Sequence, residues 1–522
     1  MSAVEATASE RSSPSESLRR AASRMPHASS EWLVAAAVAL GAALRFWRLG
    51  HQSFWYDESV TVGLLHRSLG GMLGALPHVE GTPPVYYCLA WAWTRVFGLG
   101  ATGIRSLSAA AGVGLILCAY GIGSRLVSRR TGLVAAWLVA CNPFLIWYSQ
   151  EARAYSLLAL TTGLAVLAFA NLLSNTPRPR WIVAWAVFAG VALATHYYAV
   201  VVLAPAGAWL LWIHRRDPRV WYAMLLLGMV GLALAPLALH QKHNTAWIAE
   251  EPLGPRLAQV PAQFVRGTGA PFEAWFDLAG GLAVVLGVAL LVTRARGLER
   301  SGAVLAAGLG LAGCLLSLLL ALVGVDYLIT RNLISILIPL IVGVAGGLGA
   351  RRAGLVGLGG TAVLCAVGVL ATVAVATHWR WQRPDWAGVA RIGGLSEPHA
   401  YRQLAILEDD DSLEPLGLYS PTLHGLPPWG ATVRTVTLIA VVRGPYDPLC
   451  WWGAACHLTH QPLETRLRLA GFRPRGPVRR TGQFAILRLA ASGPTRLTRG
   501  RLVTALQNTP LTSYGLFVTR PT

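Results

Sequence analysis

Residues 125–155 read RLVSRRTGLVAAWLVACNPFLIWYSQEARAY. This stretch joins a basic cluster (125–130), an apolar run (131–149) and a polar group that follows the run directly. The run is long enough for a helix that crosses a bilayer. Basic connectors favour the cytoplasmic side of a membrane, so the polar group is expected on the opposite side. The stretch therefore predicts a polytopic α-helical membrane protein with its polar candidates on the outer face.

The composition of the whole chain agrees with a membrane protein. Of the 522 residues, 54% are hydrophobic and only 13% are charged, which is not the balance of a soluble globular domain. The formal net charge is +20, and the arginines cluster at the ends of apolar runs. This placement indicates topology and argues against a nucleic-acid partner. Residues 1–30 lack the apolar core of a signal peptide, so we expect a disordered cytoplasmic tail.

The apolar runs set the number of crossings. They lie at about 31–49, 84–99, 104–124, 131–149, 152–172, 181–198, 199–213, 219–239, 276–293, 303–323, 333–350 and 354–377. From Arg125 onward, a basic connector follows every second run, which fixes the phase. The run 84–99 breaks this phase if it crosses. It is short, begins at Pro83-Pro84 and is rich in Tyr and Trp, so we expect an interfacial or re-entrant helix on the outer side.

The predicted fold is an all-α polytopic membrane domain over residues 31–377, with about 11 transmembrane helices plus the interfacial helix. Residues 378–522 are more polar and carry short β-like runs between Gly- and Pro-rich turns, which predicts a small extracytoplasmic α/β domain. Cys450 and Cys456 lie in this second domain and are either a local disulfide or two free thiols.

The sequence FWYDESVT, residues 54–61, places two adjacent acids just beyond the first apolar run. One carboxylate of Asp57 and Glu58 is suited to take a proton from an acceptor hydroxyl while the other positions it. The alternative is that Asp57 caps the helix that follows.

Four further groups fall on the same outer face. Their members are His78, Glu80 and Tyr86; Gln150, Glu151, Arg153 and Tyr155; His196 and Tyr197; and Arg331, with Arg105 as a similar case. Arginine matches two phosphate oxygens, so these arginines are candidates for a phosphate. Each group has a structural alternative. The first is an ordinary polar loop, the second an ion pair of Glu151 and Arg153 that closes the 149–153 hairpin, the third an aromatic belt anchor, and the fourth an Asp326–Arg331 pair. No Gly-rich nucleotide loop and no CxxC or HExxH zinc pattern is present, so a donor that lies in the membrane is expected.

Several strings share an order and spacing over residues 45–200: WYDES (55–59), TPPVYY (82–87), RSLS (105–108), NP (142–143), YSQEARAY (148–155) and THY (195–197). Together they resemble the GT-C superfamily of integral-membrane glycosyltransferases, in particular the bacterial family-39-like branch related to protein O-mannosyltransferases and aminoarabinose transferases. The resemblance implies a multi-pass protein of the bacterial plasma membrane that uses a polyprenyl-phosphate sugar, with mannose favoured by family habit. Asp57 matches the catalytic-loop aspartate of the family, and Arg331 is the candidate for the phosphate-contacting arginine. Asn332 stands where an aromatic residue commonly follows that arginine.

The hypothesis is an inverting sugar transfer with Asp57 as general base. Glu58 and Glu151 would orient the sugar or the acceptor, while Arg153 and Arg331 would neutralise the departing phosphate. The partners would be the lipid-linked donor, membrane lipids, and a glycan, lipid or protein acceptor. The sequence specifies no cofactor, and dependence on a divalent metal stays open. The rivals are a lipid or solute transporter or flippase, which would place polar groups at mid-span, and a non-catalytic membrane protein.

Overall fold

A computed structural model describes residues 27–174, 176–395, 401–407, 413–441, 469–507 and 515–520. Most of the predicted N-terminal tail lies outside these residues, as do Cys450 and Cys456.

All eleven apolar runs that were predicted to cross form helices. They are α2 (His27–Phe46), α6 (Ala101–Leu126), α7 (Arg129–Cys141) with α8 (Pro143–Ser149), α9 (Tyr155–Leu172), α10 (Pro179–Thr195), α11 (Val200–Ile213) after η1 (Tyr197–Ala199), α12 (Pro218–Gln241), α15 (Glu273–Thr293), α16 (Gly297–Leu322), α17 (Ile334–Leu348) after η3 (Thr330–Leu333), and α18 (Gly354–Thr377). Within the described ranges, seven helices are long and apolar enough to cross a membrane, and the bent pair α7–α8 makes an eighth. A mostly helical polytopic protein is confirmed, while eleven crossings stay a prediction.

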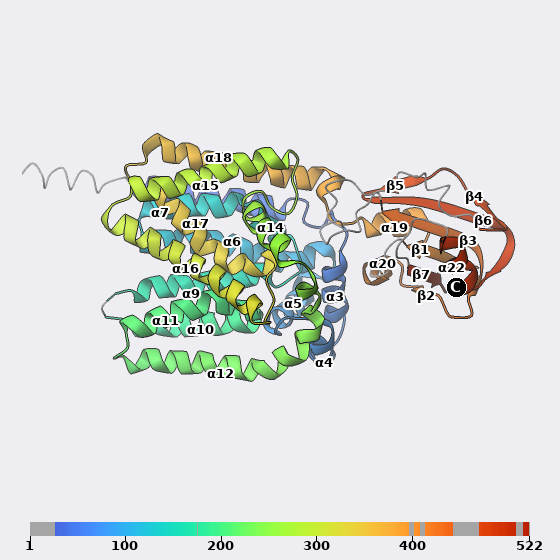
Figure 1. Cartoon of the computed structure of the whole chain (residues 1–522), viewed down its shortest axis with the longest axis horizontal. Helices are drawn as coiled ribbons and strands as arrows, with labels where there is room; N and C mark the ends of the chain where they lie inside the picture. Colours follow the sequence, from blue (N-terminus) through green and yellow to red (C-terminus); the bar gives the residue numbers. More distant parts are fainter. Residues whose placement is uncertain are drawn as a thin grey trace, which may run out of the picture.

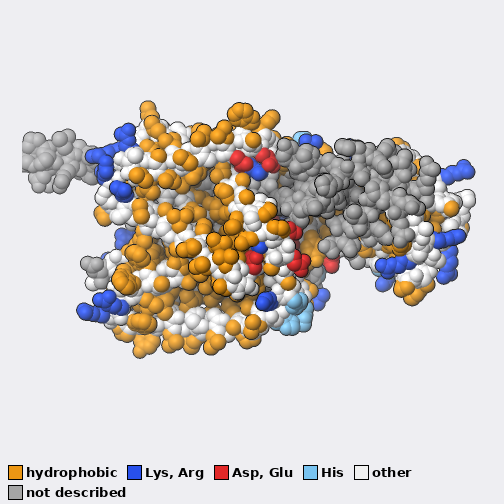
Figure 2. Space-filling view, viewed as in Figure 1, with side chains coloured by type: hydrophobic (Ala, Val, Ile, Leu, Met, Phe, Trp, Pro, Cys, Tyr) orange, Lys and Arg blue, Asp and Glu red, His pale blue; other side chains and the backbone are white. Residues whose placement is uncertain are grey.

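The helices form one bundle, with a sheet domain beyond one of its ends (Figure 1). Apolar side chains cover the flank of the bundle, and Lys and Arg side chains gather at the end farthest from the sheet (Figure 2). Close packing in the bundle uses small residues. A Cβ on Gly347 of α17 would lie 1.8 Å from the carbonyl oxygen of Gly287 in α15, so these helices approach with no room for a side chain.

Three short helices cover the end of the bundle that faces the sheet domain: α3 (Tyr56–Leu65), α4 (Leu69–Val79) and α5 (Val85–Phe97) (Figure 1). The run that was predicted to be interfacial is α5, whose 13 residues extend only about 20 Å, too short to cross. The helices α3 and α4 lie between the apolar runs and were not among the helices expected from the sequence.

The bend between α7 and α8 shapes the site. The Asn142 side chain caps α8 by accepting from the Leu145 amide at 2.9 Å, and Pro143 starts the new helix, so the axis turns by 58°. The bend frees carbonyls at the end of α7. The buried Arg45 of α2 donates to the carbonyl oxygens of Val139 at 3.0 Å and Ala140 at 3.1 Å and so satisfies them.

The long segment between α12 and α15 returns along the same end of the bundle. It contains η2 (Lys242–Thr245), α13 (Trp247–Glu250) and α14 (Leu253–Arg266). Of these, α14 packs on α15, α8 and α18, and its Arg256 reaches inward from there.

The C-terminal region is the predicted α/β domain. After η4 (Trp379–Trp381) and α19 (Trp386–Gly393) come β1 (Arg402–Leu407), α20 (Leu413–Tyr419), β2 (Leu423–Gly425), β3 (Ala431–Val441), β4 (Phe472–Pro474), β5 (Arg479–Thr481), β6 (Phe484–Leu497), α22 (Arg499–Gln507) and β7 (Gly515–Thr519). The seven strands form one sheet in the order β2-β7-β1-β3-β6-β4, with β5 also on β6. Only β1 and β3 run parallel among the pairs of described strands.

Candidate active site

A cavity of about 1050 Å³ lies where the short helices, the 240–266 segment and the start of the C-terminal domain meet. Seven of the residues singled out from the sequence line it: Asp57, His78, Glu80, Arg153, Tyr155, His196 and Arg331. Six others do not: Glu58, Tyr86, Arg105, Gln150, Glu151 and Tyr197. The cavity thus collects the outer-face candidates from segments that are far apart in the sequence.

Asp57 and Arg331 form an ion pair in the wall of the cavity. Arg331 Nη1 donates to Asp57 Oδ2 at 2.8 Å, and each side chain is 15% exposed. Two aromatic rings flank the guanidinium, with centroids 5.8 Å (Tyr155) and 5.6 Å (Trp247) away. The site therefore offers one carboxylate and one aromatic-lined cation side by side.

Asp57 does not cap α3. The N-cap residue is Trp55, and it makes no side-chain capping bond, so the capping alternative does not describe this site. Asp57 instead lies in the first turn of α3, where an acid is favoured by the helix dipole.

Glu58 points away from Asp57 into the protein. It is fully buried and receives two bonds from Arg105: Nε to Oε1 at 2.7 Å and Nη2 to Oε2 at 2.6 Å. The Ala152 amide donates to Oε1 at 2.8 Å. Burial raises the pKa of Glu58, but Arg105, Arg383 and the Ala152 amide outweigh it, and the net shift is downward.

Arg105 is saturated as well. Besides Glu58, it donates to the carbonyl oxygens of Leu49, Gln52 and Ser53 at 2.9–3.0 Å, which fixes the loop before α3. Neither member of this pair reaches the cavity. Glu58 and Arg105 therefore form a buried ion pair beneath α3. They do not contact the cavity, where the sequence suggested a role for Glu58 beside Asp57 and for Arg105 at a phosphate.

A second ion pair lies in the cavity wall. Arg153 binds both carboxylate oxygens of Glu80, with Nη2 to Oε2 at 2.9 Å, and the Glu80 side chain is 3% exposed. Arg153 Nη1 also donates to the backbone carbonyl of Asp57 at 3.2 Å and to Thr61 at 3.3 Å. Arg153 thus connects the turn after α8 to α3 and holds the backbone of Asp57.

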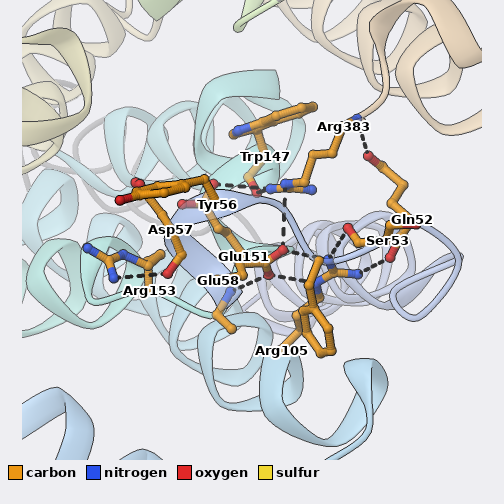
Figure 3. A network of polar contacts seen from close by, with 12 residues as sticks. Gln52, Ser53, Tyr56, Asp57, Glu58, Arg105, Trp147, Glu151, Arg153 and Arg383 are labelled. Atoms are coloured by element: carbon orange, nitrogen blue, oxygen red, sulfur yellow. Dashed lines mark hydrogen bonds and ion pairs between the residues drawn. The ribbon is translucent and has the colours of Figure 1, made fainter. Parts of the chain in front are cut away.

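Glu151 occupies a buried position in the turn between α8 and α9. Its Oε2 accepts from Arg383 Nη2 at 3.1 Å, and its Oε1 is buried without a hydrogen-bond partner. Burial, which Arg383 only partly offsets, raises the pKa of Glu151 to about 7. Figure 3 shows this carboxylate among Glu58, Trp147 and the guanidinium of Arg383. Arg383 was not predicted as a site residue.

His196 lies between α10 and η1, where its Nδ1 accepts from the Tyr198 amide at 3.1 Å. Burial, together with the nearby Arg153 and Arg331, lowers the pKa of His196 to about 3. The ring is therefore neutral near neutral pH and lines the cavity as a neutral imidazole.

The remaining candidates take other places. His78 is exposed at the cavity rim and contacts His240 edge-to-face at 5.0 Å. Tyr86 is fully buried against Tyr87, Gln150 donates to three carbonyls at the end of α2, and Tyr197 donates to Gln241 at 2.7 Å.

Asp326 does not pair with Arg331, the partner that the sequence suggested. It accepts two bonds from Arg256 of α14, at 2.9 and 2.7 Å. Arg256 is 6% exposed and lines the cavity, and it was not among the residues expected from the sequence. Because Asp326 is occupied in this way, Arg331 is left to Asp57.

Within the part of the chain that the structure describes, no group of three or more His, Cys, Asp or Glu side chains is arranged to hold a metal ion. Each of the cavity carboxylates that the sequence singled out, Asp57 and Glu80, contacts a guanidinium instead.

Comparison with known proteins adds a family match. Residues 81–240 match the family model of dolichyl-phosphate-mannose-protein mannosyltransferase. This range includes Glu151, Arg153, Tyr155 and His196 of the site. No curated protein matches the chain.

Three solved structures illustrate the similarity. The Saccharomyces cerevisiae protein O-mannosyltransferase Pmt1-Pmt2 complex bound to the sugar donor is 16% identical, with a TM-score of 0.32, over 42% of this chain and 33% of that chain. ArnT from Cupriavidus metallidurans in the apo state is 14% identical (TM-score 0.48; 88% and 98% covered). AglB from Archaeoglobus fulgidus with an inhibitory peptide and a dolichol-phosphate is 12% identical (TM-score 0.43; 92% and 77% covered).

This chain therefore spans about a third of the length of the yeast protein. All three TM-scores lie below 0.5, and these similarities carry no further conclusion. The resemblance of the sequence to the GT-C membrane glycosyltransferases thus has the support of one family match, over residues 81–240.

Proposed function

We propose that this protein transfers a sugar from a polyprenyl-phosphate donor to a hydroxyl group of an acceptor on the extracytoplasmic side, with Asp57 as the general base. The observation that carries the proposal is the Asp57–Arg331 contact of 2.8 Å on the wall of the cavity. It supplies a proton acceptor and a phosphate-binding cation within one site. The family match favours mannose as the sugar.

The contact suggests an order of events. Without donor, Arg331 neutralises Asp57. The donor phosphate would compete for Arg331 and leave the Asp57 carboxylate free to accept a hydrogen bond from the acceptor hydroxyl. In the transfer step, Asp57 takes the hydroxyl proton, the acceptor oxygen bonds to the anomeric carbon, and the bond from that carbon to the phosphate oxygen breaks. The electron pair leaves with the polyprenyl phosphate, and Arg331 stabilises its added negative charge.

The other charged groups support this pair. Arg153, fixed by Glu80, holds the backbone of Asp57 at 3.2 Å. Beneath α3, the Glu58–Arg105 pair locks the helix to the preceding loop, so we assign Glu58 to positioning rather than to proton transfer. Tyr155 and Trp247 beside Arg331 offer faces against which a sugar ring or an isoprenoid packs.

We infer the side of the membrane from the charge pattern. Lys and Arg side chains gather at the end of the bundle farthest from the sheet domain, and the cavity lies at the opposite end (Figures 1 and 2). Basic ends favour the cytoplasm, which supports an extracytoplasmic cavity and an extracytoplasmic C-terminal domain.

The test is label transfer by purified protein in lipid nanodiscs from polyprenyl-phosphate [³H]mannose to envelope extracts, with glucose- and aminoarabinose-linked donors in parallel. Asp57→Asn should reduce transfer at least about 100-fold, the usual minimum contribution of a general base. The matched control is Asp217→Asn at the N-cap of α12, outside the cavity, which should keep wild-type activity.

Full transfer by Asp57→Asn would refute its role as base. Movement of the intact donor across the bilayer without transfer would favour the flippase alternative. Absence of both donor binding and transfer would contradict the proposal as a whole.

A further inference from the structure

Arg383 lies where the transmembrane bundle gives way to the C-terminal domain, between η4 and α19. A junction of this kind usually carries solvated side chains, and its neighbour Arg380 is exposed. The Arg383 side chain, in contrast, is only 2% exposed and lines the cavity. Its position therefore calls for a role inside the site.

The guanidinium joins two segments of the catalytic region (Figure 3). It lies 4.1 Å from the ring centroid of Trp147, and Nη2 donates to Glu151 Oε2 at 3.1 Å and to the Trp147 carbonyl at 3.4 Å. Its Nε lies 4.0 Å from Glu58 Oε2. The backbone amide of Arg383 donates to Gln52 Oε1 at 2.8 Å, which adds the loop before α3.

Charge balance makes this contact important. Glu58 has Arg105 and the Ala152 amide, whereas Arg383 is the one ion-pair partner of Glu151 among the described residues. The second oxygen of Glu151 is buried without a hydrogen bond. Without Arg383, the Glu151 carboxylate would be buried and uncompensated, which is strongly unfavourable.

Glu151 begins the turn that holds α3 in place. The next residue, Ala152, donates its amide to Glu58 at 2.8 Å, and Arg153 donates to the carbonyl of Asp57 at 3.2 Å. A shift of this turn therefore moves both acids of α3. Positions held to within about half an ångström matter for catalysis, since an error of 1 Å can cost about 100-fold in rate.

The C-terminal domain in turn fixes Arg383. Asp385, two residues later, accepts from Ser53 Oγ at 3.1 Å, from the Gly388 amide at 3.0 Å and from Thr481 at the end of β5. Tyr419 of α20 accepts from the Phe54 amide at 2.8 Å. The loop that contacts the C-terminal domain through Ser53 and Phe54 thus leads directly into α3, the helix that contains Asp57.

We propose that Arg383 is a positioning residue of the transfer reaction, which holds the α8–α9 turn and Trp147 in place and makes the junction of the C-terminal domain part of the active site. The kinetic part of this inference rests on the proposed function. It assigns to the C-terminal domain a part in the chemistry that is distinct from contact with the acceptor.

The kinetic test compares Arg383→Gln and Arg383→Lys with the matched control Arg380→Gln. Arg383→Gln should lower kcat at least tenfold and change the donor KM less than threefold, because its guanidinium is engaged by Glu151 and Trp147. Arg383→Lys should recover part of kcat, because it keeps the charge and loses the planar stack on Trp147. Arg380→Gln, an exposed position in the preceding η4, should match wild type.

The pH profile separates positioning from a general loss of folded protein. Loss of the Arg383 charge leaves Glu151 facing Glu58 and Asp57 of α3, with Arg331 of η3 as the remaining nearby cation. The deficit in kcat of Arg383→Gln relative to wild type should therefore grow as pH rises and Glu151 ionises without its counter-charge. Wild-type kcat and an unshifted profile would overturn the proposal.

A second experiment measures the structure of the turn and does not depend on activity. Hydrogen–deuterium exchange of residues 150–154 should quicken at least tenfold in Arg383→Gln and stay unchanged in Arg380→Gln. The double variant Arg383→Gln/Glu151→Gln removes both charges together, so it tests the same turn if the single variant does not fold. Wild-type exchange in a folded Arg383 variant would refute the role of Arg383, whereas an inactive wild-type protein with quickened exchange in the variant would refute only the proposed function.

Discussion

Arg331 Nη1 and Asp57 Oδ2 lie 2.8 Å apart although 274 positions separate them in the chain. The arginine begins one of the last helices and the acid lies just after the first. Each neutralises the other in the absence of substrate, and the two groups are the ones that a transfer from a lipid phosphate requires. Under the proposed function, binding of an anion to Arg331 would release the base at this one contact.

This coupling predicts opposite effects of two substitutions on phosphate binding. Arg331→Gln should weaken binding of farnesyl phosphate roughly 10- to 100-fold, the range of a hydrogen bond to a charged group. Asp57→Asn should bind the same probe more tightly than wild type, because Arg331 loses its competitor. Calorimetric titration in nanodiscs measures both, and equal weakening in the two variants would show that the contact does not gate the phosphate.

The buried pair beneath α3 should matter for stability more than the catalytic pair. Glu58→Gln leaves Arg105 with a buried, uncompensated charge, so we expect a loss of about 3–5 kcal/mol in the free energy of unfolding. Asp57→Asn, at a partly exposed pair, should cost about 1 kcal/mol or less. Thermal unfolding in detergent compares the two, and equal midpoints would contradict the assignment of Glu58 to positioning.

Glu151 should make stability fall as pH rises. Its pKa is raised to about 7 in the folded protein, from a usual value of 4.5, so the folded state binds more protons between these values. Stability that is present near pH 4.5 is then lost as pH rises toward 7, by at most about 3 kcal/mol from this group. In Glu151→Gln this slope should flatten, as measured by unfolding midpoints from pH 5 to 8, and an unchanged slope would count against the buried ionisation.

His196 should act in the opposite direction. Its pKa is lowered to about 3 from 6.5, so the unfolded state binds more protons between these values. The stability from a neutral, buried ring is therefore complete above pH 6.5 and decreases as pH falls. His196→Asn retains an acceptor for the Tyr198 amide and should remove this acid-side loss. A variant that is as acid-sensitive as wild type would show that other groups dominate.

Arg45 should stabilise the bend between α7 and α8. Arg45→Leu leaves the carbonyls of Val139 and Ala140 without this donor, and we expect a loss of about 3 kcal/mol. Arg352→Leu, the same change at an exposed turn, should alter the unfolding midpoint little. Similar midpoints for the two variants would show that the bend does not depend on Arg45.

Much of the membrane domain was predictable because hydrophobic length is a strong signal. Each of the eleven runs became a helix, and α5 became a helix too short to cross. In contrast, α3 and α4 escaped prediction, since they have only 10 and 11 residues and α4 contains three glycines and Pro77. Such composition is typical of a loop, and packing on the bundle decides the outcome.

The sequence indicated many of the residues that line the cavity, but it did not indicate which of them pair with each other. Asp57 and Glu58 are neighbours in the sequence, but consecutive residues of a helix point about 100° apart, so one faces the cavity and the other faces the interior. The partners of Asp326 and Glu151 come from segments 70 and 232 positions away. No local pattern specifies contacts of that range.

The contact between Glu151 and Arg383 can form only late in synthesis of the chain. Glu58 meets Arg105 after 47 further residues, but Glu151 needs a partner that is made 232 residues later. At roughly 5–20 residues per second, that interval lasts about 10 to 50 s. During it, Glu151 lacks the guanidinium that pairs with it in the finished protein. If the proposed function holds, the site can reach its final geometry only after the chain beyond α18 has been made.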